Sequence, residues 1–173
     1  DFGDNSNVCA WCHQSRRAEP NIDIPGATYE ITSTHYGPHH GAMANVWAGF
    51  GFAEIAGSTA YPTSNLHETA GATCVTCHMS DYSSDGYDGD PAGGHTWWPN
   101  VDACQDCHAT TDFNYGGVQD DMQVLLDALR DLLVGQGVLE YVVADDAYEP
   151  VVGTYDMVQA QAFFNWVGLT EDR

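Results

Sequence analysis

The six cysteines of this chain constrain its fold more than any other feature. They form three C-x-x-C pairs, and a histidine directly follows each pair. The three motifs are Cys9-Ala-Trp-Cys12-His13, Cys74-Val-Thr-Cys77-His78 and Cys104-Gln-Asp-Cys107-His108. Two thiols at this spacing can each bond to one of the two vinyl groups of a haem, and the following imidazole can bind the iron. The sequence therefore predicts three covalently bound c-type haems, with these six thiols as attachment points and these three histidines as proximal ligands.

Zinc sites and redox-active dithiols also use C-x-x-C pairs. Neither requires a histidine after every pair, and in a chain of this composition three such histidines would occur by chance with a probability on the order of 10⁻⁴. In a zinc-binding chain each C-x-x-C pair would be half of a site, so three pairs would leave one without a partner. Haem attachment takes place outside the cytoplasm, so we expect an extracytoplasmic protein, at the cell surface or extracellular, otherwise periplasmic. The start at Asp1 rather than Met is what a mature chain without its leader would show.

The remaining histidines are candidates for the second axial ligand, which a low-spin electron-transfer haem takes from His or Met. They are His35, His39, His40, His67 and His95. His67 and His95 lie in loops among small residues, which let an imidazole approach a porphyrin closely, and we predict both as distal ligands. In HYGPHHG, residues 35–41, the Gly-Pro turn should aim His35 and the His39/His40 pair in different directions. His35 is the first choice for the third iron, followed by His40 and then His39.

Methionine is the competing ligand. Met79 follows His78 too closely to reach the opposite face of the same haem, and Met43, Met122 and Met157 lie in apolar patterns typical of packing. Bis-histidine ligation of all three haems is the simpler assignment.

The charge of the chain is strongly negative, with 25 Asp and Glu against 4 Arg and a net charge of -21. Nucleic acid and anionic membrane surfaces are therefore poor candidates for partners, and we expect no membrane insertion because no stretch is apolar and long enough to span a bilayer. Such a surface keeps a protein soluble, binds cations or suits high salt. The loop 81–90, DYSSDGYDGD, has oxygen ligands for calcium but not the EF-hand spacing, so we expect a solvated loop there.

Domain organisation follows the motifs. We predict a haem-binding region at residues 1–112 and a haem-free, mainly helical subdomain at 113–173, which contains no Cys or His. Apolar residues in the second region recur at three- and four-residue steps, which predicts an amphipathic helix ending near Gly135 and Gly137. Its predicted inner face consists of Val118, Met122, Leu125, Leu126, Leu129, Leu132 and Leu133.

Further elements are expected on either side of this helix. A short strand is predicted at 138–143 and a second helix at about 155–167, with Val158, Ala162 and Trp166 facing inward. A helix at 42–56 is weakened by Gly49 and Gly51. With 18 Gly and 7 Pro in the chain, the predicted fold class is a multihaem cytochrome c: mostly irregular coil with short helices packed around three haems.

Three phrases of the sequence resemble multihaem c-type cytochromes: HYGPHHG, SNLHETAGATCVTCHM and GGHTWWPNVDACQDCH. They are most similar to small outer-surface cytochromes that polymerise into conductive filaments, and more distantly to ammonia-forming nitrite reductases. The resemblance covers about residues 9–110. It implies closely stacked haems, with His35, His67 and His95 matching the distal phrases, and a histidine of one subunit able to ligate a haem of the next. The chain departs from the filament cytochromes in having three haem motifs rather than four or more. Its tail, from Phe163 on, also looks like a segment that in relatives continues into another histidine-bearing stretch.

Function depends on whether any iron keeps an open position. Nitrite reductases typically use Lys in place of one proximal His, and this chain has no Lys. Because its histidines suffice to close every site, we predict electron transfer without catalysis, as the subunit of an extracellular filament. The expected partners are further copies of the chain and redox proteins or extracellular acceptors. A soluble periplasmic shuttle, which the negative charge favours, and a nitrite- or hydroxylamine-type reductase are the alternatives.

Overall fold

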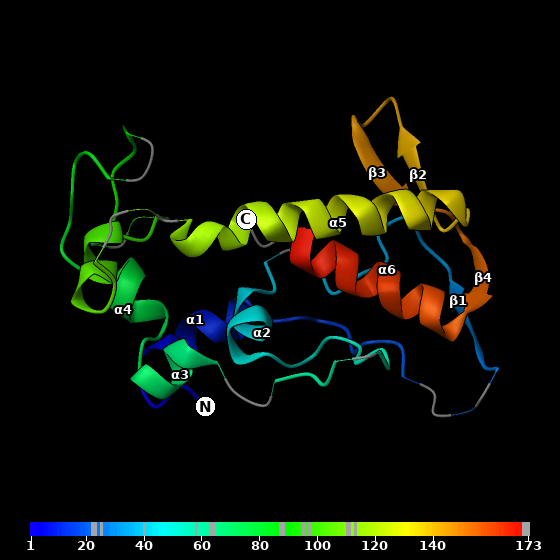
Figure 1. The fold of residues 1–173 in the computed structure, drawn as a ribbon. Coiled ribbons are helices and arrows are strands. Elements are labelled where there is room, and N and C mark those ends of the chain that lie inside the picture. Colours follow the sequence, from blue (N-terminus) through cyan, green and yellow to red (C-terminus); the bar gives the residue numbers. More distant parts are fainter. Residues whose placement is uncertain are drawn as a thin grey trace. The chain divides into compact units, whose positions relative to one another are not determined.

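The fold of the chain is that of a computed structural model (Figure 1). The residues that it describes are 1–21, 24, 26–39, 41–57, 59–62, 65–86, 89–94, 96, 98–109, 112 and 114–170. The chain forms two compact units, each built from two separate segments. Unit 1 comprises Asp1–Trp11 and Ser64–Asp121, and unit 2 comprises Cys12–Thr63 and Met122–Arg173. Packing therefore divides the chain differently from the haem motifs, and the boundary at residue 112 stays a prediction about cofactor binding.

Unit 2 consists of helices and two small antiparallel sheets (Figure 1). Its helices are α2 (Met43–Ala48), α6 (Met157–Thr170) and all but the first turn of α5 (Val118–Gly135). Strand β1 (Thr28–Ile31) pairs with β4 (Gly153–Asp156), and β2 (Leu139–Val142) pairs with β3 (Ala147–Pro150). Helices α5 and α6 lie side by side, and the indole Nε1 of Trp166 donates to the Leu126 carbonyl at 3.0 Å.

The hydrophobic core lies in unit 2. Its buried residues are Ile31, Tyr36, Leu126, Leu133, Val138, Leu139, Phe163, Phe164 and Trp166. Burying one such aliphatic or aromatic side chain stabilises a fold by about 1.5–3 kcal/mol, so this cluster is a source of stability for unit 2 that comes from its own side chains.

The structure confirms the predicted helix over α5 and the predicted strand over β2. The inner face of α5 is narrower than predicted: Leu126 and Leu133 are buried and Leu129 packs against the core, whereas Leu125 and Leu132 are each 64% exposed. A helix that contacts a core along one line buries only the residues on that line.

Two further predictions need correction. In α6, Trp166 is buried as expected but Val158 is 57% exposed, so it does not face inward. The helix predicted at 42–56 is only α2, because Gly49 adopts a left-handed conformation with φ of 66° and ends the helix there.

Unit 1 contains only short helices among its described residues. They are α1 (Ser6–Cys12, which runs one residue past the boundary), α3 (Leu66–Ala70), α4 (Cys74–His78) and the 3-10 helices η2 (Val101–Asp106) and η3 (Tyr115–Gly117). None of its described residues belongs to the hydrophobic core cluster. Those that are buried are small or polar: Ser6, Thr73, Ala92, Gly93 and Asn100. Large apolar side chains are exposed instead, Trp11 by 80% and Leu66 by 87%.

In the described part of the chain, no helix has both the length and the apolar character needed to cross a bilayer.

Candidate functional site

All three C-x-x-C-H motifs begin on a helical turn. Helix α1 carries the first pair of cysteines and α4 the second, while η2 carries Cys104 and ends directly before Cys107. The backbone N–H groups of Cys107 and His108 both donate to the Cys104 carbonyl, at 3.1 and 2.7 Å. Residues three apart lie on one face of a helix, so each turn places its two thiols on the same side.

The sequence explains why these turns form. Thr73 caps α4 in a capping box, in which its own N–H donates to Thr76 Oγ1 at 3.0 Å. Asn100 caps η2 by accepting from the Asp102 N–H at 2.9 Å. A cap satisfies backbone donors that a short helix leaves unpaired, and this stabilises helices too short to persist by themselves.

All six cysteines lie among the described residues and carry free thiols that are partly or fully exposed. Burial raises the pKa of the Cys74 and Cys104 thiols, and burial together with the nearby Cys104 raises the pKa of Cys77. These thiols are therefore neutral at pH 7, which is the opposite of the lowered pKa that activates a catalytic cysteine.

Helix α4 is hydrogen-bonded at both ends within unit 1. At its N-terminus the Val75 N–H donates to Ser6 Oγ at 3.1 Å, and Thr73 Oγ1 donates to Asp4 at 2.6 Å. At its C-terminus the Asn100 N–H donates to the Cys77 carbonyl at 3.1 Å. The second motif is thus tied to the segment before the first motif and to the segment before the third.

Ser6, Thr73 and Asn100 are therefore structural residues of the site that the sequence interpretation missed. Each is a buried polar residue near an attachment motif: the side chains of Ser6 and Asn100 accept from backbone N–H groups, and the Thr73 hydroxyl donates to Asp4. The available signal was their position, because Thr73 and Asn100 are N-cap types that come directly before the helices of the second and third motifs.

Within unit 2, the histidine of the first motif, His13, lies beside the histidine-rich segment 35–41. The Ala44 N–H donates to the His13 carbonyl at 2.8 Å, and the Arg16 N–H donates to the Pro38 carbonyl at 3.0 Å. Gly41, with φ of 75°, lies so close that a Cβ added there would be 3.4 Å from Nδ1 of His13. The glycine that ends HYGPHHG thus lets the chain pass the proximal histidine.

Two histidines of segment 35–41, His35 and His39, lie among the described residues, and both are exposed. His35 is exposed, and its Nδ1 lies 3.3 Å from Thr34 Oγ1. His39 is also exposed and adopts φ of 78°, a left-handed conformation uncommon for residues other than glycine. His40 lies outside the described residues, as does His95.

His67 lies on helix α3 and not in a loop as predicted, because Asn65 caps a helical turn directly before it. Its ring is near His108 of the third motif. Its ring centre is 6.2 Å from that of His108, and the two ring planes are inclined by 80°. The ring of Tyr115 packs directly on His108, with centres 4.2 Å apart. The structure therefore brings together one predicted distal ligand and one predicted proximal ligand.

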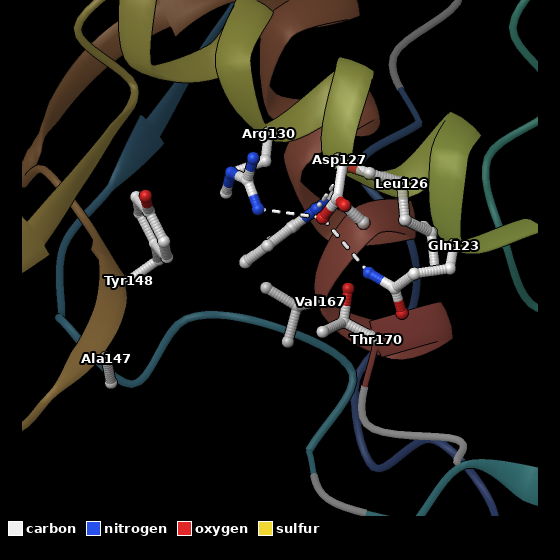
Figure 2. Close-up of a pocket in the computed structure, with 9 residues that line it drawn as sticks. Gln123, Leu126, Asp127, Arg130, Ala147, Tyr148, Val167 and Thr170 are labelled. Carbon is white, nitrogen blue, oxygen red and sulfur yellow. Dashed lines mark hydrogen bonds and ion pairs between the residues drawn. The ribbon is translucent and has the colours of Figure 1, made fainter.

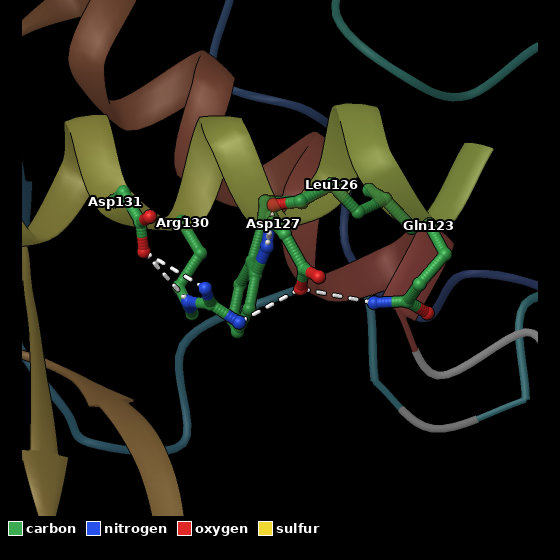
Figure 3. Close-up of polar contacts among 6 residues, drawn as sticks. Gln123, Leu126, Asp127, Arg130 and Asp131 are labelled. Atoms are coloured by element: carbon green, nitrogen blue, oxygen red, sulfur yellow. Dashed lines mark hydrogen bonds and ion pairs between the residues drawn. The ribbon is translucent and has the colours of Figure 1, made fainter. Parts of the chain in front are cut away.

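Among the described residues, the motifs included, no three His, Cys, Asp or Glu side chains gather as a metal site would require. A hollow in unit 2, between α5, β3 and α6, has other chemistry (Figure 2). Arg130, which lines it, binds Asp127 at 2.7 Å and Asp131 at 2.9 Å (Figure 3). The Arg130 guanidinium lies 5.3 Å from the Tyr148 ring centre. No thiol or imidazole lines this hollow in the described part of the chain.

The donor set around the motifs fits covalently bound haem. Each pair of thiols lies on one side of a helical turn with its histidine directly after it, and all six thiols can be reached. Trp11 and Leu66 expose large apolar surfaces next to Cys12 and His67. Unit 1 also lacks an apolar cluster among its described residues, so a bulky apolar cofactor would supply what its own side chains do not.

Comparison with known proteins gives one similarity. The chain is similar to the C-type polyheme cytochrome OmcB of Geobacter sulfurreducens, in strain DL-1/KN400 and in strain ATCC 51573/DSM 12127/PCA. In each case the identity is 27% over an alignment 190 positions long. That alignment covers 95% of this chain and 25% of the relative. The chain thus spans about a quarter of the length of these relatives. No family model and no solved structure matches it.

Proposed function

We propose that this chain is an electron-transfer protein that carries three covalently bound c-type haems. The observation that carries the proposal is the set of six free thiols, paired on helical turns, each pair with a histidine directly after it. The similarity to a polyheme cytochrome over nearly the whole chain supports it independently.

The residues have separate roles in this proposal. Bound haem c supplies one-electron redox chemistry at its iron. The six cysteines hold the cofactors, and His13, His78 and His108 are the proximal ligands. His35, His67 and His95 are the distal ligands, with His40 and His39 as the other candidates in segment 35–41. Histidine at every distal position would keep the reduction potentials lower than methionine would.

The hydrogen bonds of α4 support one order of the attachment sites. Because α4 is hydrogen-bonded to Ser6 at one end and to Asn100 at the other, we place the second haem site between the first and the third. Consecutive sites would then be neighbours, as a chain of electron carriers requires.

At the level of assembly, we propose a subunit of an extracellular filament whose main partners are further copies of this chain. Eight histidines exceed the two axial positions at each of three irons, and His35 is exposed, so segment 35–41 can supply a ligand to a neighbouring copy. Redox proteins or extracellular acceptors would exchange electrons with it. An extracytoplasmic location follows from where haem is attached to C-x-x-C-H motifs.

A soluble periplasmic shuttle is the second candidate. The net charge of -21 favours it, because like-charged monomers repel each other and a polymer must offset that repulsion with cations, salt or large interfaces. A nitrite- or hydroxylamine-type reductase would instead need one iron without a distal ligand.

The haem content is tested by the intact mass of the native protein. We expect three haems per chain, and two in a variant with Cys104→Ala and Cys107→Ala. A native chain without haem would refute the proposal. Resting absorption and EPR spectra then separate electron transfer from catalysis, since a high-spin signal would indicate an open iron.

The assembly is tested by electron microscopy of native material at growth ionic strength. Ordered filaments that dissolve when salt and divalent ions are removed would support the polymer. Dispersed particles under both conditions would support the shuttle and leave the haem assignments unchanged.

A further inference from the structure

The distance between His67 and His108 is that of two ligands on one metal. An imidazole nitrogen lies about 2 Å from a transition metal that it binds and about 1 Å from its own ring centre, so two imidazoles on opposite sides of one iron have ring centres about 6 Å apart. The observed separation is 6.2 Å. Both ring planes would contain the metal–nitrogen axis, which allows any angle between them, including the observed 80°.

Tyr115 provides a contrast within the same site. Its ring centre is only 4.2 Å from that of His108, a direct packing contact with no room for a metal between the rings. His67 stands farther away and is exposed to solvent. A plain edge-to-face ring contact also falls within this range of distances, and it is the alternative that an experiment must separate from ligation.

The backbone of α3 fixes His67 from both ends. Asn65 Oδ1 accepts from the Glu68 N–H at 2.7 Å and caps the first turn. At the other end Gly71 has φ of 74°, and the Ala72 N–H donates to the His67 carbonyl at 2.8 Å. Caps at both ends order a five-residue helix that would not persist alone, so the backbone position from which the His67 side chain projects is set locally.

We propose that His67 is the distal ligand of the haem attached at Cys104 and Cys107, opposite His108. This inference rests on the proposed function, because it needs that haem to be present. Only residues 71–73 separate α3 from α4, which carries the second attachment motif. One short segment therefore holds the second haem covalently and ligates the third, which ties the two cofactors to each other.

The test is a His67→Ala variant of the haem-loaded protein, with intact mass, absorption and EPR as readouts. We expect three haems still attached, one of the three low-spin signals lost, a high-spin signal in its place, and recovery of the low-spin signal on adding imidazole. The lost signal should be strongly anisotropic, because nearly perpendicular imidazole planes leave two iron d orbitals almost equal in energy. His67→Met should instead keep that haem low-spin and raise its reduction potential.

Glu68→Gln, in the same helical turn, is the matched control and should keep all three low-spin signals. The assignment to the third haem is tested in a chain with Cys104→Ala and Cys107→Ala. There His67→Ala should leave both remaining haems unchanged, whereas an altered haem would mean that His67 ligates another iron and would overturn the proposal. Three unchanged low-spin signals in the His67→Ala variant would overturn the proposal, because His67 and His108 would then be in ring contact only. Only a native chain without haem would count against the proposed function itself.

Discussion

A haem-free chain, made by replacing all six cysteines with alanine, should unfold in unit 1 and stay folded in unit 2. The described helices within unit 1 have at most seven residues, and isolated helices shorter than about 12 residues are marginal in water. Unit 2 has the longer helices α5 and α6 and the complete hydrophobic cluster. The two units should therefore respond differently to loss of the cofactor.

The free energy that keeps unit 2 folded without haem can be worked out from three core side chains. Leu133 is 3% exposed, and Phe163 and Phe164 are fully buried. At about 1.5–3 kcal/mol each, their burial opposes the separation of α5 and α6 by roughly 4.5–9 kcal/mol before other terms are counted. An opening free energy of about 4 kcal/mol slows amide hydrogen exchange about a thousandfold. Without haem, the described part of unit 1 has no comparable burial, and its amides should exchange at nearly the unfolded rate.

Hydrogen exchange followed by mass spectrometry of peptides from both units measures this difference directly. In the haem-free chain, Phe163→Ala should cost about 3–5 kcal/mol and remove the protection of α6. Val158→Ala, in the same helix but at an exposed position, should change stability by less than about 0.5 kcal/mol. Equal protection of both units, or equal loss in both, would refute the reasoning that only unit 1 depends on haem for its core.

Three smaller predictions concern polar contacts. Asn100→Ala removes the cap of η2 and should lower the free energy of unfolding of the haem-loaded protein by about 1 kcal/mol, read from the denaturant midpoint; an unchanged midpoint would mean that the cap is not needed. The hydrogen bond from Thr73 lowers the pKa of Asp4, so its stabilising effect is present above the ordinary carboxyl pKa and is lost as the pH falls through the lowered value. Thr73→Val should remove that acid-dependent loss from a plot of stability against pH, and an identical plot would contradict this role. Arg130→Met breaks partly exposed ion pairs with Asp127 and Asp131 and should cost no more than about 1 kcal/mol in thermal unfolding, whereas a larger loss would show that the pairs are better shielded than their exposure indicates.

The sequence was informative wherever the relevant chemistry is local. The second motif, Cys74-Val-Thr-Cys77-His78, places its thiols and histidine on one turn whatever the rest of the fold does, and the structure has that turn in α4. The apolar periodicity of α5 likewise predicted a helix and its end. The width of its buried face could not be read in this way. The exposure of Leu125 and Leu132 depends on how many neighbours pack on the helix, which is a property of the tertiary fold.

The contact between His67 and His108 is the clearest example of a feature that the sequence could not predict, because it joins segments far apart in the chain. The sequence named both His67 and His108 as candidate ligands, but no local pattern connects α3 with the residue that follows η2. The same holds for Gly41 beside His13, where the contact depends on backbone hydrogen bonds between two separate segments. Spacing can give the number and type of ligands, whereas their assignment to individual irons requires the path of the chain in three dimensions.

The two units bury different kinds of residue, and this difference bears on the cofactor. Unit 2 buries aromatic and aliphatic side chains, whereas the described residues of unit 1 bury Ser6, Thr73 and Asn100 and expose Trp11 and Leu66. Buried polar groups are tolerated where they are hydrogen-bonded, and the side chains of these three are hydrogen-bonded around the attachment motifs. Exposed large apolar side chains mark surfaces that contact another molecule when they gather near a binding site. Beside thiols spaced for haem, that molecule is best explained as the cofactor itself, which would cover Trp11 and Leu66 and leave the polar residues to hold the turns.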